Sequence, residues 1–357
     1  MYFKHKFFGF IFNIFSKISP KNNRISFISD SNESFKGNLD YIKAEFDRRG
    51  DFEFNNFYKD KFSLNKFYKL ATSEYVFLDD NFFPMAFMNF NLKSKVIQLW
   101  HAPGAFKKFG ASSGDSNEIA MLKKISNNTD YLIISSDNII EEYSEAFQIP
   151  KSKIRPLGLP RSDYFFKNHD LDKLRRDFNS KFPQAEGKKL ILYAPTFREE
   201  GSFSNVLDFE KFNRELGDEY ILLLRLHPKK FSSEDFKSDS NYINCTDFKN
   251  PNELLLLSDI LITDYSSIMI DFALLDKPII FFTYDLDEYL ARDRGFYFDF
   301  KKTVPGNIVY TSDELINVIS DKDFKTDKIR PFLETQFNEL DGQASKRVVD
   351  FILNNEG

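Results

Sequence analysis

The 357-residue sequence contains a single cysteine, Cys245, so no disulfide can form within the chain. A chain without disulfides fits a reducing cytoplasm. Neither a Walker A sequence nor a Rossmann glycine fingerprint occurs, which excludes the commonest glycine-rich phosphate loops. No Cys/His cluster has the spacing of a metal site, and no spacing among the acidic residues is diagnostic. The sequence therefore predicts no bound cofactor and gives no sign of a metal site.

An excess of basic charge is also lacking. The formal net charge is −5, and 42% of the residues are hydrophobic, which describes a globular protein and argues against nucleic acid as a partner. No apolar run approaches the roughly 20 residues that a membrane-spanning helix needs. The length fits two domains of roughly 100 to 200 residues each.

Residues 1–24 depart from this average composition. They carry five basic residues and no acidic one, and aromatic and aliphatic side chains lie between the basic ones. The five are Lys4, Lys6, Lys17, Lys21 and Arg24. No small-residue cleavage site follows, which argues against a signal peptide. Two interpretations stay open: a peripheral anchor on the anionic cytoplasmic face of the membrane, or an ordinary first helix docked on the domain.

Short apolar runs alternate with helical patterns along the rest of the chain. Strands are expected at 24–29, 51–58, 75–78, 95–100 and 131–135, and the pattern restarts with strands at 190–195 and 220–226. This alternation predicts an α/β protein with two Rossmann-like, doubly wound domains facing a cleft. We place the domains at 25–165 and 166–357, with a linker-like stretch at 150–163.

The stretch 258–282 combines a buried strand at 260–262, a polar turn, a helix and a second buried strand at 279–282. Its polar turn includes Asp264, Ser266 and Ser267. Hydroxyls and free N–H groups at a helix start, at the carboxyl end of a strand, suit an anion such as a nucleotide pyrophosphate. Simple N-capping of the helix by Asp264 or Ser266 is the alternative.

Two of the four histidines, His101 and His227, directly follow apolar strands, one in each half of the chain. At neutral pH an imidazole in such a place can accept a proton from an alcohol or donate a hydrogen bond to a phosphate. A structural histidine at a strand end is the alternative. Five basic residues would supply the positive charge that phosphoryl transfer needs, unless they are solvated loop charges: Arg198, Lys229, Lys230, Lys107 and Lys108.

Seven blocks in order resemble the CDP-glycerol glycerophosphotransferase family of teichoic acid and capsule polymer synthesis. They are QLWHAPGAFKKFG at 98–110, GLPRSD at 158–163, LYAPTFR at 192–198, LLRLHP at 223–228, SDILITDYSSIMIDFALLDKPIIFF at 258–282, RDRGFYFDFKKTVPG at 292–306 and DGQASKR at 341–347. The resemblance implies a GT-B fold, in which two Rossmann-like domains face each other.

The resemblance also implies roles for individual residues. His101 and His227 match the family's paired histidines, of which one activates the acceptor hydroxyl and the other supports the donor phosphates. The nucleotide site falls on Thr196, Arg198, Asp264, Ser266 and Ser267, with Asp271 at the ribose and Arg294 at a phosphate. Gly104, Lys107, Lys108 and Arg161 are candidate acceptor or phosphate contacts.

The implied reaction moves a polyol phosphate, with glycerol phosphate as the leading candidate, from CDP-glycerol or a related CDP-polyol. The acceptor is a hydroxyl of a cell-wall or capsule polymer or its lipid-linked primer, and CMP is released. Trp100-His101-Ala102 stands where many members have Trp-His-Gly, which leaves priming and polymerisation both open. The alternatives are a GT-B glycosyltransferase using a nucleotide sugar and a non-catalytic membrane-associated partner in polymer assembly.

Overall fold

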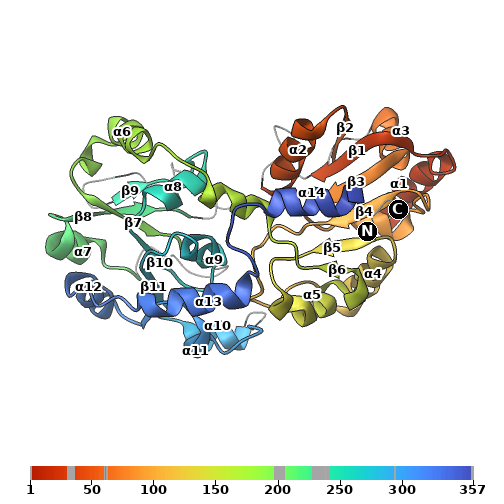
Figure 1. Ribbon diagram of the computed structural model, residues 1–357. Helices are drawn as coiled ribbons and strands as arrows, with labels where there is room; N and C mark the ends of the chain where they lie inside the picture. The colour runs from red at the N-terminus through yellow and green to blue at the C-terminus, as the bar shows by residue number, and fades with distance from the viewer. Residues whose placement is uncertain are drawn as a thin grey trace. The chain divides into compact units, whose positions relative to one another are not determined.

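The structure is a computed structural model that describes residues 2–29, 37–59, 61, 63–196, 206–226, 238, 242–292 and 295–354. The chain divides into two compact units (Figure 1). Unit 1 comprises Met1–Phe166 and Thr335–Gly357, and unit 2 comprises Lys167–Glu334. Each unit contains a six-stranded parallel sheet with helices packed on it, so the predicted α/β class is confirmed.

The sheet of unit 1 has the strand order β2-β1-β3-β4-β5-β6. Its strands are β1 (Lys21–Ser29), β2 (Glu53–Tyr58), β3 (Ser73–Leu78), β4 (Lys95–Gln98), β5 (Tyr131–Ile133) and β6 (Ile154–Arg155). Its α-helices are α1 (Tyr2–Phe15), α2 (Asn38–Arg49), α3 (Leu64–Ala71), α4 (Ser116–Asn127), α5 (Ile140–Phe147) and α14 (Ala344–Asn354). The short β6 lies within the stretch interpreted as a linker.

Helices cover both faces of the unit 1 sheet, and because successive side chains of a strand point to opposite faces, both sets of side chains are buried. Phe27 in β1 and Phe77 in β3 pack with Phe46 of α2 on one face. Their neighbours Ile28 and Leu78 join a cluster on the other face with residues of α1 and α3. This explains why these strands are continuous apolar runs.

The helix α1 packs on the rest of unit 1, which agrees with the interpretation of residues 1–24 as an ordinary first helix docked on the domain. Phe8 and Phe12 are buried in the cluster shared with α3. Gly9 permits the close approach, since a Cβ there would lie 2.4 Å from the carbonyl oxygen of Phe87. Asn13 Nδ2 donates to the same oxygen over 3.0 Å. None of the helices in the described part of the chain is long and apolar enough to cross a membrane.

Unit 2 has the strand order β12-β11-β10-β7-β8-β9. Its strands are β7 (Lys189–Tyr193), β8 (Tyr220–Leu224), β9 (Tyr242–Asn244), β10 (Ile260–Thr263), β11 (Ile279–Phe282) and β12 (Asn307–Val309). Its helices are α6 (Leu171–Lys181), α7 (Phe209–Leu216), α8 (Pro251–Leu257), α9 (Ile268–Ala273), α10 (Leu286–Arg292), α11 (Phe300–Thr303) and α12 (Ser312–Ser320). The chain passes back to unit 1 within a further helix, α13 (Ile329–Gln336). Ile191, Leu222 and Ile262 pack with residues of α7 and α12 in one cluster.

The C-terminal residues correct the predicted domain boundary. We placed all of 166–357 in the second domain, but residues 335–357 belong to unit 1. In Figure 1 the blue helix α14 lies beside α2, and its Val348, Val349 and Ile352 are buried in the cluster that contains Phe46. An amphipathic pattern predicts a buried helix face but does not specify which sheet it covers, so the sequence could not show this return.

Candidate active site

The loop that carries His101 leaves β4 through a strained residue. Trp100 has a φ of 55°, a left-handed conformation that is uncommon for a side chain of this size. Its backbone N–H donates to Gln98 Oε1 over 2.8 Å, and its carbonyl oxygen accepts from Asn38 Nδ2 over 2.5 Å. The turn is therefore held on both sides, and it directs the next residue, His101, away from the strand.

The imidazole of His101 lies against two oxygen acceptors on its Nδ1 side. Nδ1 is 3.3 Å from the carbonyl oxygen of Asp79 and 3.8 Å from Oδ1 of Asp80. The Trp100 ring packs on the imidazole with the centroids 4.1 Å apart. The His101 side chain is 55% exposed, so a substrate can reach the ring.

The surroundings of His101 change its proton affinity in two directions. Although the side chain is partly exposed, neighbouring atoms exclude water from the imidazole ring. This desolvation lowers the pKa of His101 below its ordinary value. The Asp80 carboxylate and the Asp79 carbonyl oppose this change, whereas Arg161 and Lys59 add to it. A lowered pKa keeps the imidazole neutral at pH 7, the form that accepts a proton.

Arg161, which the sequence predicted as an acceptor or phosphate contact, contacts the backbone of His101 in the structure. Its Nη1 donates to the carbonyl oxygen of His101 over 2.9 Å. Its backbone N–H donates to Oδ1 of Asn38 over 2.9 Å, so Asn38 joins the two loops that carry Trp100 and Arg161. Arg161 therefore positions the His101 loop in this structure.

The remaining predicted residues of this loop differ in accessibility. Gly104 is buried with a φ of 57°, and its carbonyl oxygen accepts from the hydroxyl of Tyr143 over 2.8 Å. Gly104 contributes through its backbone conformation, because a positive φ favours glycine. Lys107 and Lys108 are half-buried in the same loop. Their predicted phosphate contacts stay predictions.

In unit 2, Asp264 ties together the ends of two neighbouring strands. Its carboxylate accepts from the backbone N–H of Thr196, at 2.8 and 3.0 Å, and from that of Tyr265 at 2.5 Å. Thr263 Oγ1 donates to the carbonyl oxygen of Ala194 over 2.8 Å, which adds a second tie. Asp264 is 2% exposed, so it acts here by holding the loops after β7 and β10 in place.

The start of α9 carries the two serines of the polar turn. Ser266 Oγ accepts from the backbone N–H of Ile268 over a long 3.4 Å, and Ser267, at the N-cap position, makes no side-chain capping bond. Both are half-buried. Asp271 is 3% exposed, so the predicted ribose contact requires movement of the atoms that cover it.

Several predicted site residues lie outside the described residues: His227, Arg198 and Arg294, together with the neighbouring Lys229 and Lys230. Their roles stay predictions.

Sequence reasoning missed two residues of the site, Asn38 and Asp80. Asp79 and Asp80 directly follow β3, the neighbour of β4 in the sheet, as His101 closely follows β4. The same signal that selected His101, a polar residue after a buried strand, could have found them. Asn38 opens α2 and has no comparable signal.

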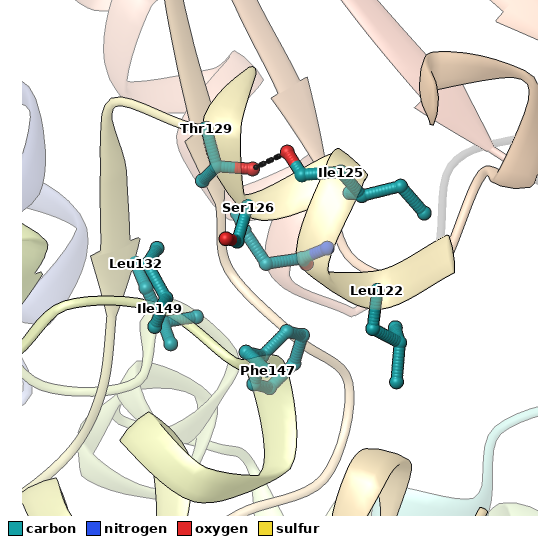
Figure 2. A pocket seen from close by; sticks show the side chains of 8 residues that line it. Leu122, Ile125, Ser126, Thr129, Leu132, Phe147 and Ile149 are labelled. Atoms are coloured by element: carbon teal, nitrogen blue, oxygen red, sulfur yellow. Dashed lines mark hydrogen bonds between the residues drawn. The ribbon is translucent and has the colours of Figure 1, made fainter. Parts of the chain in front are cut away.

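A small pocket lies between the sheet and two helices of unit 1 (Figure 2). Leu122, Leu132, Phe147 and Ile149 make most of its lining apolar. The hydroxyl of Thr129 is already bonded to the carbonyl oxygen of Ile125 over 3.1 Å, as the dashed line in Figure 2 shows. No charged side chain lines it, so it does not suit a nucleotide phosphate.

Comparisons with known proteins agree with the family resemblance of the sequence. A family model described as CDP-Glycerol:Poly(glycerophosphate) glycerophosphotransferase matches residues 11–354. The teichoic acid poly(ribitol-phosphate) polymerase of Bacillus spizizenii is 37% identical over 97% of this chain. The matched region makes up only 58% of the length of that polymerase. The teichoic acid ribitol-phosphate primase of the same species is 36% identical over 80% of this chain and 76% of its own length.

Among solved structures, a variant of the wall teichoic acid polymerase TagF soaked with CDPG has a TM-score of 0.81. It is 22% identical, and the match covers 98% of this chain and 93% of that one. This likeness, together with the two parallel sheets, confirms the predicted GT-B type of fold.

Proposed function

Because the chain belongs to the CDP-glycerol:poly(glycerophosphate) glycerophosphotransferase family, we propose that it transfers a polyol phosphate from a CDP-activated donor to a hydroxyl group. The acceptor hydroxyl belongs to a teichoic acid polymer or to its lipid-linked primer. The transferred group is glycerol phosphate or ribitol phosphate, since the family description and the relatives' names include both.

The observation that carries this proposal is the state of His101. Its ring is exposed, its Nδ1 side is occupied by acceptors, and its pKa is lowered, so the free nitrogen Nε2 is suited to accept a proton. The acceptor oxygen attacks the phosphorus that carries the polyol, and its proton passes to His101 Nε2. The bond from that phosphorus to the bridging oxygen breaks in line, and CMP leaves with the bridging oxygen.

The donor nucleotide binds to unit 2 in this proposal. Half-buried Thr196, Ser266 and Ser267 offer hydroxyl groups to the phosphates, and Asp264 maintains the two loops that carry them. His227, Arg198 and Arg294 add donors and positive charge by the family resemblance. A crystal of the chain with CDP whose density lies against unit 1 alone would contradict this assignment.

We further propose that the outer face of α1 rests on an anionic membrane surface. Phe3, Phe10 and Ile14 are 85%, 65% and 53% exposed, while Phe8 and Phe12 on the opposite side hold the helix to unit 1. Lys4 and Lys6 are exposed on the same helix. Basic and aromatic side chains together favour the headgroup region of an anionic leaflet.

The released nucleotide tests the proposed reaction. The purified chain is incubated with CDP-glycerol, CDP-ribitol and a set of nucleotide sugars, each with a teichoic acid primer or polymer. Formation of CMP together with a new phosphodiester supports the proposal. Release of a nucleoside diphosphate from a nucleotide sugar would instead identify a glycosyltransferase, and no turnover with any donor would favour a non-catalytic partner.

A further inference from the structure

The carboxylate of Asp80 is fixed before any substrate arrives. Its Oδ1 accepts from the backbone N–H of Asn81 over 2.8 Å, and its Oδ2 is 3.3 Å from Nζ of Lys59. Lys59 also donates to the carbonyl oxygen of Asn81 over 2.9 Å, so its ammonium group holds the whole turn after β3. An anchored carboxylate needs little rearrangement to interact with a neighbouring group.

The groups around Nδ1 of His101 decide which ring nitrogen carries the proton. Both the Asp79 carbonyl oxygen, at 3.3 Å, and the Asp80 carboxylate, at 3.8 Å, can only accept. The neutral imidazole that suits them has its proton on Nδ1, which leaves a lone pair on Nε2. Trp100 packs on the ring and restricts its rotation.

We propose that Asp80 is the positioning residue of His101: its negative charge favours the Nδ1–H tautomer whose proton points to the Asp79 carbonyl, which leaves Nε2 to the acceptor hydroxyl, and it stabilises the imidazolium formed during transfer. This inference rests on the proposed function, in which His101 is the base. The acceptor's proton moves to Nε2 while the Nδ1 proton stays on His101, and Asp80 remains ionised. The other charged groups that face His101 in the described residues are Lys59 and Arg161, and both oppose the imidazolium.

Nuclear magnetic resonance of the whole chain labelled with ¹⁵N-histidine tests the inference without any substrate. The chain has only four histidines, and the signal lost in His101→Ala is that of His101. We expect the Nδ1–H tautomer above the titration midpoint. In Asp80→Asn the midpoint should fall by about 0.5 to 1 pH unit, and the Nε2–H tautomer should gain population, although the Asp79 carbonyl still favours Nδ1–H. Asp47→Asn, which removes the same charge from an exposed pair with Lys43, should leave the signal unchanged.

A second variant should shift the titration midpoint of His101 in the opposite direction. Lys59→Met removes a positive charge that faces His101, so the midpoint should rise. An Nε2–H tautomer in the unaltered chain, or a folded Asp80→Asn protein with an unchanged midpoint and tautomer, would overturn the proposal.

Kinetics separate this inference from the proposed function. Asp80→Asn should lower kcat by about 10-fold or more with little change in the donor KM, and the acid limb of the pH profile should move to lower pH. Asp80→Glu should recover part of the rate. Near-normal turnover in His101→Ala would show that His101 is not the base and would contradict the proposed function. An inactive His101→Ala protein together with a normal Asp80→Asn protein would contradict only the positioning role of Asp80.

Discussion

The carboxylate of Asp163 holds the first turn of α14 through Ser345. Its Oδ2 accepts from the backbone N–H of Ser345 over 2.9 Å and from the hydroxyl over 2.6 Å, while Oδ1 accepts from the N–H of Ala344 over 2.9 Å. Asp163 is 5% exposed. A residue 181 positions earlier in the chain thus satisfies the free donors of a helix start and attaches the C-terminal helix to unit 1.

Replacing Asp163 with Ala should destabilise unit 1, because two buried N–H groups lose their acceptor. The expected loss is about 2 to 4 kcal/mol. The single tryptophan, Trp100, lies in unit 1, so its fluorescence during urea unfolding reports on this unit. Hydrogen exchange should show faster exchange in α14. Asp341→Asn, a control that removes an exposed carboxylate near the same helix start, should change stability by less than about 1 kcal/mol. Equal effects of the two changes would contradict the role of Asp163.

Glu53 should make the stability of unit 1 depend on acid pH. Hydrogen bonds from Lys21, and then from Lys69 and Arg24, lower the pKa of Glu53 to about 2, against the desolvation that would raise it. A folded-state pKa below the unfolded value adds stability above about pH 4.5, and this contribution is lost as the pH falls towards 2. Glu53→Gln should cost about 1 to 3 kcal/mol at pH 7, and the difference should shrink between pH 5 and 2.

The measurement is urea unfolding followed by Trp100 fluorescence across that pH range. Glu141→Gln serves as the control, since Glu141 pairs with Lys151 at the surface and is 72% exposed. Its effect should stay within about 0.5 kcal/mol. A Glu53→Gln penalty that did not change with pH would show that packing, and not charge, is what the substitution removes.

His101→Ala and His227→Ala should each reduce the chemical step by about 10²-fold or more with the identified donor. The double variant should lose less than the product of the two single losses, because groups that act together are not additive. Single-turnover rates measure this, and circular dichroism checks the fold. His169→Ala, the matched control, should keep near-normal turnover. A folded His101→Ala protein with near-normal rates would leave His101 as a structural strand cap.

The outer face of α1 should control vesicle binding. Phe3→Ser combined with Phe10→Ser removes exposed apolar groups and leaves the buried Phe8 and Phe12 in place, which deletion of the helix would not. Co-sedimentation with phosphatidylglycerol vesicles should fall by about 10-fold or more, and binding of the unaltered chain should weaken at high salt. Leu171→Ser, at a leucine 49% exposed on α6, is the control. Unchanged sedimentation of the double variant would favour a purely structural helix.

Much of the fold could be predicted because buried parallel strands are apolar runs. The expected strand at 279–282 coincides with β11, and those at 24–29, 75–78 and 220–226 differ from β1, β3 and β8 only at their ends. The two-residue β6 was missed, since so short a strand has no periodicity to detect. The candidate site was predictable in part for a related reason: His101 directly follows an apolar run, which is visible in the sequence.

The sequence by itself determined that polar residues follow buried strands: Asp79 and Asp80 after β3, and His101 after β4. Only the tertiary structure decided that these strand ends lie together, because the order β1-β3-β4 comes from side-chain packing between strands and helices far apart in the chain. The same holds for Asn38 at Trp100 and for α14 at Asp163. Local patterns record which groups must be buried or capped, whereas the partner that satisfies each group is selected by the packing of the whole unit.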